Sequence, residues 1–194
     1  DWWLTLNHKQ EIVMMTHSQT SFHSPLGWIR AVSNGSSLIR LDWDQTRWDE
    51  PDKPDDVSRE TIGQLKEYFA GDRVGFDLPI NPEGKSAPAQ HWLDVMMHIP
   101  YGSTLSYKEF AIAAGKPKAP RAAGAACASN PIPIIYPCHR VVKSDGTMGH
   151  YGGGSSLPPD NADNLARKMA LISLERQFSC CSSDQRNHHC SWSS

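Results

Sequence analysis

A stretch rich in proline and glycine, Asn-Pro-Glu-Gly-Lys-Ser-Ala-Pro at residues 81–88, divides the chain into two parts of different character. Such a composition is typical of a connector rather than of a helix or strand. Short strand-like runs dominate before it and short helices after it, and 194 residues suffice for two small domains. We therefore predict a sheet-plus-helix domain over residues 1–86, a second domain over 87–178, and a disordered tail over 179–194.

The first part contains a clear hairpin signal. Apolar runs at 28–32 and 37–43 flank Ser-Asn-Gly-Ser at 33–36, and Asn-Gly between two such runs favours a β-hairpin. A turn is expected at 22–27, before the hairpin. Residues 57–70 carry apolar side chains at near-helical spacing and are followed by Gly71, which predicts a helix. Residues 74–78 are a further strand candidate.

The second part is predicted to be mostly helical. Helices are expected at 90–98, 107–114, 120–128 and 165–176, the last with Leu165, Met169 and Ile172 on one side. Thr104 or Ser106 can cap the second of these helices, and Pro120 suits the first turn of the third. Two short helices joined by a few residues that include glycine fit a helix-turn-helix. Short strands are expected at 134–136 and 140–142.

Composition excludes several classes of protein. No apolar run approaches the length of a membrane span, and the first ten residues show no secretory signal. The five cysteines are an odd number, and none precedes Cys127. This pattern favours free thiols in a reducing compartment, so a cytoplasmic protein is expected, or a nuclear one in a eukaryote.

Charge is distributed unevenly along the chain. The formal net charge is −2, but residues 41–80 hold eleven acidic and five basic side chains, whereas residues 105–150 hold six basic and two acidic ones. A polyanion would be attracted to the second region and repelled by the first. Ordinary surface scatter is an equally good explanation of this pattern taken alone.

The tetrapeptide Pro137-Cys138-His139-Arg140 is the most informative local motif. Cysteine is nucleophilic as the thiolate, which an imidazole base, a neighbouring guanidinium or a helix dipole can favour. A buried structural cysteine or a metal ligand would fit the same residues. No second cysteine or histidine pair stands at zinc spacing, so a metal site is not expected.

Four blocks in order carry a resemblance to a known family. They are Ile99-Pro-Tyr-Gly-Ser-Thr-Leu-Ser-Tyr107, Gly115-Lys-Pro-Lys-Ala-Pro-Arg-Ala-Ala-Gly124, Asn130-Pro-Ile-Pro-Ile-Ile-Tyr-Pro-Cys-His-Arg-Val-Val142 and Tyr151-Gly-Gly-Gly154. The chain resembles the alkylguanine–DNA alkyltransferases over residues 90–154 and 165–175, and more weakly over 22–88. The resemblance implies an α/β (α+β) protein: a small ribonuclease-H-like sheet domain, then a mostly helical, winged helix-turn-helix-like alkyltransferase domain.

The resemblance also implies the reaction. Cys138 would take an alkyl group from the exocyclic oxygen of alkylated guanine once and irreversibly, with no cofactor. His139 would act as general base through a water, and Glu175 would orient the imidazole. Asn130 would tie the helix-turn-helix to the cysteine, and Tyr107 would donate to the leaving guanine. The proposed base pocket comprises Tyr151, Gly152, Gly153 and Pro133.

The implied partner is double-stranded DNA, bound through its minor groove by a monomer. Arg121 would replace the extruded base in the stack, because chemistry on a base requires its removal from the duplex. Small side chains on the same helix would permit close approach to the sugar-phosphate walls. The expected contact residues are Arg121, Tyr107, Ala122, Ala123, Gly124 and Arg140.

Three features depart from the family pattern. Residues 155–164 are additional and would widen, cover or restrict the pocket. His150 and Gly152 replace residues more usual at those positions, and the Cys/His-containing tail has no counterpart. Two other functions remain as alternatives: a damage-binding module without transfer, which the presence of Cys138 disfavours, and a cysteine hydrolase, which the helix-turn-helix disfavours.

Overall fold

The structure is a computed structural model that describes residues 17–184, with side chains to Ser179. An antiparallel sheet of order β1-β2-β3 opens the fold, made of β1 (Ser18–Ser24), β2 (Gly27–Ser33) and β3 (Leu38–Asp44). Helix α1 (Asp56–Ala70) packs against these strands. Most of the hairpin and the helix therefore lie where the sequence predicted them, although the turn at 22–27 is shorter than expected because β1 continues to Ser24.

The second part follows the connector. Its elements are α2 (Ala87–Met97), β4 (Leu105–Ser106), α3 (Tyr107–Ala113), α4 (Pro120–Ala128), the short 3-10 turn η1 (Cys138–Arg140), β5 (Val141–Val142) and α5 (Ala162–Asp184). Strands β4 and β5 pair in parallel. Helices α3 and α4 pack on each other as expected for a helix-turn-helix, and Ser106 rather than Thr104 caps α3 through a capping box.

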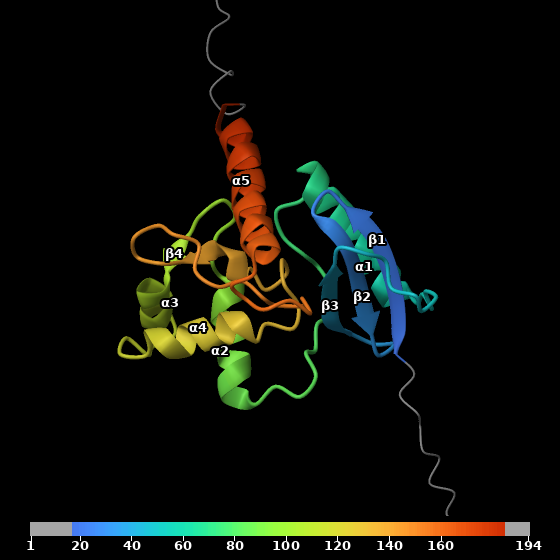
Figure 1. Cartoon of the computed structure of the whole chain (residues 1–194), viewed down its shortest axis with the longest axis horizontal. Coiled ribbons are helices and arrows are strands. Elements are labelled where there is room, and N and C mark those ends of the chain that lie inside the picture. The colour runs from blue at the N-terminus through green and yellow to red at the C-terminus, as the bar shows by residue number, and fades with distance from the viewer. Residues whose placement is uncertain (1–16, 185–194) are drawn as a thin grey trace, which may run out of the picture.

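In Figure 1, α5 stands above helices α2–α4, with the sheet to its right. The two parts share one apolar core, which runs from Ile29, Leu41 and Trp43 to Phe110 and Leu171. They are also joined by backbone hydrogen bonds, since Leu41 N donates to Pro131 O at 2.9 Å and Trp43 N donates to Gly154 O at 2.6 Å. Strand β3 therefore touches the segments on both sides of Cys138 in sequence.

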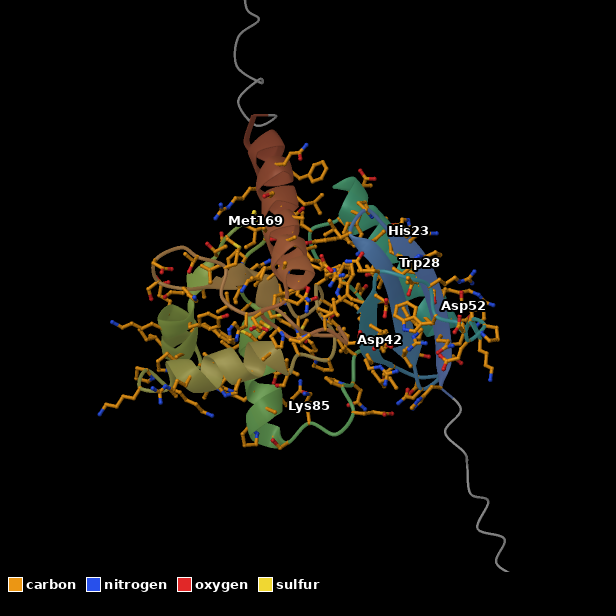
Figure 2. All side chains as sticks on the ribbon, in the orientation of Figure 1. His23, Trp28, Asp42, Asp52, Lys85 and Met169 are labelled. Atoms are coloured by element: carbon orange, nitrogen blue, oxygen red, sulfur yellow. The ribbon has the colours of Figure 1, made fainter. Side chains whose placement is uncertain are left out.

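The connector is attached to the end of α4. Lys85 points from it toward the helices (Figure 2), and its Nζ donates to the Ser129 carbonyl oxygen at 2.6 Å. This bond satisfies a carbonyl just beyond the carboxyl-terminal end of α4, where backbone acceptors lack helical partners. The connector thus helps to fix the helix that precedes Asn130.

Two predicted strands are absent. Residues 74–78 form no strand because the Gln64 side chain occupies their backbone: Nε2 donates to Asp77 O at 2.8 Å, and Oε1 accepts from Asp77 N at 2.9 Å. Residues 134–136 form a turn, with Ile134 at a φ of 73°. Prolines at 131, 133 and 137 lack the N–H that a regular ladder needs.

Helix α5 differs from the prediction on two points. Met169 is 54% exposed and lies on the outer side of the helix (Figure 2), whereas the buried side carries Asn164, Arg167, Lys168 and Glu175 beside Leu171 and Ile172. The helix also continues to Asp184, past the expected start of the tail. The rest of that tail, residues 185–194, lies outside the described residues.

Candidate active site around Cys138

The thiol of Cys138 lies in a buried turn that Asn130 holds in place. The residue is 1% exposed, and its Sγ accepts a hydrogen bond from Asn130 Nδ2 at 3.0 Å. The same amide donates to Tyr136 O at 2.7 Å, while Asn130 Oδ1 accepts from Ile132 N at 3.0 Å. Both N–H donors of the Asn130 side chain and one acceptor site of its oxygen are thus used within the turn. The predicted link between the helix-turn-helix and the cysteine is therefore present in the geometry.

His139, the residue after Cys138 in the chain, forms a buried pair with Glu175. His139 Nε2 lies 2.8 Å from Glu175 Oε1, and the two side chains are 0% and 1% exposed. An ionised carboxylate only accepts hydrogen bonds, so Nε2 carries the proton and Nδ1 keeps a lone pair. Nδ1 is buried without a hydrogen-bond partner among the described residues. The imidazole thus has one free basic nitrogen.

Glu175 is held by several donors besides His139. Arg140 donates through Nε at 2.9 Å and Nη2 at 2.8 Å, Gly102 N donates at 3.0 Å, and the Tyr68 hydroxyl donates at 2.8 Å. Although burial alone would raise it, the hydrogen bonds from His139 and Arg140 and the charge of Arg140 hold the pKa of Glu175 far below its usual range. The carboxylate stays charged at every pH near neutrality.

Arg140 does not face a DNA surface. It is 6% exposed, binds Glu175, and donates from Nη1 to Ile99 O at 2.6 Å. Its charge is neutralised by Glu175 rather than available to a phosphate. The prediction that Arg140 contacts DNA is therefore wrong, because its guanidinium binds Glu175. The sequence alone does not show this pairing.

The electrostatics keep the resting thiol protonated. Burial raises the pKa of Cys138, and the Asn130 hydrogen bond and the nearby Lys168 charge only partly oppose this effect. Burial likewise lowers the pKa of His139, which leaves the imidazole neutral. A standing thiolate, as sequence reasoning favoured, is therefore not what this geometry stabilises. Deprotonation has to accompany the reaction.

Lys168 is a residue of this site that sequence reasoning missed. Its Nζ donates to Val141 O at 2.6 Å and to the carbonyl oxygens of Met148 and His150. The side chain is buried, so it ties β5 to the segment that follows it while placing a positive charge near the thiol. A lysine within an amphipathic helix pattern is ordinarily solvated, and the sequence gives no signal of this role.

A cavity of about 490 Å³ opens beside α4. It is lined by Tyr107, Pro120, Arg121, Gly124, Ala125, Ala128, Lys143, Gly149 and His150. Arg121 and Ala122 are exposed on this helix, as expected of a contact surface. Ala123 is fully buried in the core and cannot contact DNA there, which corrects that prediction. The alanines of α4 that are exposed and line the cavity are Ala125 and Ala128.

Tyr107 lines the cavity and lies near enough to Cys138 to interact with it electrostatically. Its hydroxyl donates to His150 O over 3.5 Å. Burial raises the pKa of Tyr107, so the hydroxyl remains a donor. Cys138 itself does not line the cavity. A reactant in this cavity would therefore reach the buried sulfur only after neighbouring atoms move.

The proposed pocket residues lie close to Asn130 but are tightly covered. A Cβ on Gly153 would lie 2.8 Å from Asn130 O, and one on Gly154 would lie 3.1 Å from Pro133 Cγ. Tyr151 is 2% exposed, and its N–H already donates to Pro159 O at 2.8 Å. Pro159 also packs against Gly152. The additional segment 155–164 thus covers this side of the site, the second of the three possibilities that the sequence left open.

No group of three metal-binding side chains occurs within the described part of the chain. The two cysteines described there, Cys127 and Cys138, are both free and buried. Helices long and apolar enough to cross a membrane are likewise absent from residues 17–184. The side chains of the remaining cysteines and of the histidine pair in the tail lie outside the described residues. The expectation that they form no metal site is therefore not tested.

Known proteins match both halves of the chain. Residues 18–82 match the 6-O-methylguanine DNA methyltransferase, ribonuclease-like domain, and residues 88–177 match the DNA binding domain of the same family. A methylated-DNA–protein-cysteine methyltransferase of Methanosarcina barkeri is 41% identical over 142 residues, covering 69% of this chain and 87% of the relative. One of Mycobacterium tuberculosis is 37% identical, covering 84% and 93%.

Solved structures agree with the sequence matches. The crystal structure of the M. tuberculosis O6-methylguanine methyltransferase superposes with a TM-score of 0.70 at 33% identity, covering 84% of this chain and 94% of that one. A second structure shows that protein in complex with DNA, with a TM-score of 0.68 at 34% identity and coverage of 81% and 92%. On sequence and structure together, the chain belongs to the 6-O-methylguanine DNA methyltransferase family.

Proposed function

We propose that this protein repairs DNA directly, by transferring an alkyl group from the exocyclic oxygen of alkylated guanine to Sγ of Cys138. The observation that carries the proposal is the buried array in which Asn130 contacts the sulfur while His139, next to it in the chain, is oriented by Glu175. A nucleophile, a base and a group that orients the base are the parts such a displacement needs.

The residues account for every proton and electron pair in the step. Sγ forms a bond to the alkyl carbon, the carbon–oxygen bond breaks, and its electron pair goes to the guanine oxygen. The thiol proton passes to His139 Nδ1, directly or through a water, and Glu175 stabilises the resulting imidazolium. The Tyr107 hydroxyl gives a proton to the leaving guanine anion, and the imidazolium releases the former thiol proton to solvent, from which Tyr107 is reprotonated. The thioether has no facile route back to a thiol, so each molecule reacts once.

The DNA side of the reaction involves α4. We place this helix in the minor groove of double-stranded DNA, with Arg121 filling the space of the extruded base and Ala122 and Gly124 allowing close approach. Extrusion costs a few kcal/mol, less for a damaged pair, which favours alkylated sites. The extruded base would enter the cavity beside Tyr107 and displace the weak Tyr107–His150 contact. Tyr151, Gly152, Gly153 and Pro133 would then form the wall next to the base.

The proposal extends to the organisation of the chain. We place the division between the two domains at residues 86 and 87, within the connector that Lys85 ties to α4. The protein is expected to act as a monomer without a cofactor, in the cytoplasm, or in the nucleus of a eukaryote. The shared core and the Glu175 contacts support a design in which both domains stay together on DNA.

Intact-mass measurement tests the proposal. The full chain is mixed with a duplex oligonucleotide containing O6-methylguanine, and a Cys138→Ser variant serves as the matched control. We expect one added methyl group on the peptide that contains Cys138, a restored guanine in the DNA, and no mass change in the variant. An unmodified wild-type protein bound to the duplex would instead support a damage-binding module, and turnover without DNA affinity would support a cysteine hydrolase.

A further inference from the structure

The amino-terminal domain contributes a side chain to the array around Cys138. Tyr68, near the end of α1, is fully buried, and its hydroxyl donates to Glu175 Oε1 at 2.8 Å. The two residues are 107 positions apart in the sequence. This bond is therefore a direct contact between the first domain and the carboxylate that orients His139.

Aromatic neighbours hold the Tyr68 ring in one position. Its ring centroid lies 5.5 Å from that of Phe69, 5.6 Å from that of Phe76 and 6.1 Å from that of Tyr101. Burial and the Glu175 charge raise the pKa of Tyr68 well above its usual value, so the phenol keeps its proton. A ring fixed in this way presents a permanent donor to Glu175.

The Tyr68 bond matters because it shares an acceptor with the imidazole. Oε1 of Glu175 accepts from both the Tyr68 hydroxyl and His139 Nε2. Each additional donor takes up part of the negative charge that would otherwise stabilise a protonated imidazole. Removing one donor should make the carboxylate a stronger partner for the imidazolium.

Other charged or titratable groups lie near the pair formed by His139 and Glu175. They are Lys168 from α5, Arg140 from the turn that carries His139, and Tyr101 from the segment after α2. Removing the hydroxyl of Tyr68 deletes none of these groups, and each keeps its own hydrogen-bonding atoms. A change in the behaviour of His139 after that substitution can therefore be assigned to the Tyr68–Glu175 bond.

We infer that Tyr68 is a positioning residue for the reaction at Cys138: its hydroxyl fixes the Glu175 carboxylate and limits the negative charge that Glu175 presents to His139. This inference rests on the proposed function and deepens it. It assigns the amino-terminal domain a part in the chemistry, because removing this contact changes the base that accepts the thiol proton.

The test is the pH dependence of single-turnover methyl transfer by the Tyr68→Phe variant in the full chain. His139 must be neutral to accept the thiol proton, so a raised imidazole pKa moves the acidic limb of the rate profile to higher pH. We expect the acidic limb to move up by on the order of half to one pH unit, and hence transfer to be roughly three- to tenfold slower at a pH on that limb, with recovery on the plateau at higher pH.

Tyr101→Phe is the matched control. This ring packs against Tyr68, but its hydroxyl has no hydrogen-bond partner within the described chain. We expect a wild-type profile from it. Transfer by Tyr68→Phe that is unchanged, or slowed equally at every pH, would overturn the inference, since the latter is the mark of a merely structural role.

A second measurement separates this inference from the proposed function. The ring of His139 can be titrated by NMR in the wild type and in Tyr68→Phe without any substrate. An upward movement of its midpoint in the variant supports the role of Tyr68 even if the wild type transfers nothing, in which case the proposed function alone fails. An unchanged midpoint overturns the inference whatever the activity.

Discussion

The Nδ2 atom of Asn130 lies 3.0 Å from the Sγ atom of Cys138, which joins the residue just beyond α4 directly to the buried sulfur. A single side chain, that of Asn130, thus connects the helix proposed to bind DNA with the sulfur proposed to react. If α4 shifted when the protein bound DNA, Asn130 would move with it, and its hydrogen bond to the thiol would change.

Replacing Asn130 with alanine should destabilise the fold and impair transfer. The variant leaves the Ile132 amide without its buried acceptor, at a cost of about 1–3 kcal/mol in the free energy of unfolding. The Tyr136 carbonyl loses the Asn130 donor but keeps the one from Cys138 N at 2.8 Å. Chemical denaturation measures this loss. Ser129→Ala, which removes only an exposed hydroxyl contact at 3.4 Å, is the control and should unfold like the wild type. Equal stability of the two variants would contradict the role given to Asn130.

Glu175→Gln should be more damaging than any exposed substitution in α5. The amide would turn an N–H₂ group toward donors from Arg140, Gly102, Tyr68 or His139, and it would leave the Arg140 charge buried without its counterion. We expect a loss of about 3–5 kcal/mol in unfolding free energy together with slower transfer. Glu83→Gln, at an exposed glutamate, is the control and should change neither quantity.

How far the sequence alone leads is clearest at His139 and Arg140. The motif around Cys138 predicted the base and its partner Glu175, because the family resemblance carries them residue by residue. It did not reveal that Arg140 binds the same carboxylate or that Tyr68 reaches it from another domain. Such contacts join positions 35 and 107 residues apart, and no local pattern in the sequence encodes them.

The strands were predictable where apolar runs flank a turn. They were not predictable where a side chain forms hydrogen bonds with the backbone groups that a neighbouring strand would otherwise bind. The Asn-Gly hairpin appears as expected between β2 and β3. Residues 74–78 have the same apolar character, but Gln64 binds both backbone groups of Asp77 and no strand pairs with them. On α5, the spacing of Met169 predicts a buried apolar side chain, but Met169 is exposed. The buried side of the helix carries Arg167, Lys168 and Glu175, which form hydrogen bonds with polar groups inside the protein.

Arg121→Ala should impair repair of duplex DNA without affecting the chemistry. Arg121 is exposed and lines the cavity beside α4, so its loss costs little stability. If the side chain replaces the extruded base, transfer from a duplex should fall on the order of 10- to 100-fold, because extrusion costs a few kcal/mol. Transfer from free O6-benzylguanine, which needs no extrusion, should be unchanged. A parallel loss with both substrates would contradict the role in base extrusion.

Acid should weaken the fold in two stages that follow from the site. The pKa of His139 is lowered by burial, so as pH falls below about 6.5 the unfolded chain binds a proton that the folded chain resists, and stability declines. The pKa of Glu175 is lowered as well, so a second loss begins as pH falls below its usual value of about 4.3. Denaturation in urea, in a pH series that starts at about pH 7.5 and continues well below pH 4, measures both. His139→Gln should remove the first stage and leave the second.

Gly149→Ala should displace Tyr107 and change access to Cys138. Gly149 has a φ of 64°, and a Cβ there would lie 2.7 Å from the Tyr107 hydroxyl oxygen. Gly115 has a similar φ of 69°, with no atom within 4 Å of its added Cβ. Both alanine variants bear the same left-handed strain of about 1–2 kcal/mol, so the difference between them isolates the contact with Tyr107. We expect Gly149→Ala to alter the rate of Cys138 modification by a thiol reagent and by O6-benzylguanine, whereas Gly115→Ala should react like the wild type. Identical rates in the two variants would show that Tyr107 does not control the way to the sulfur.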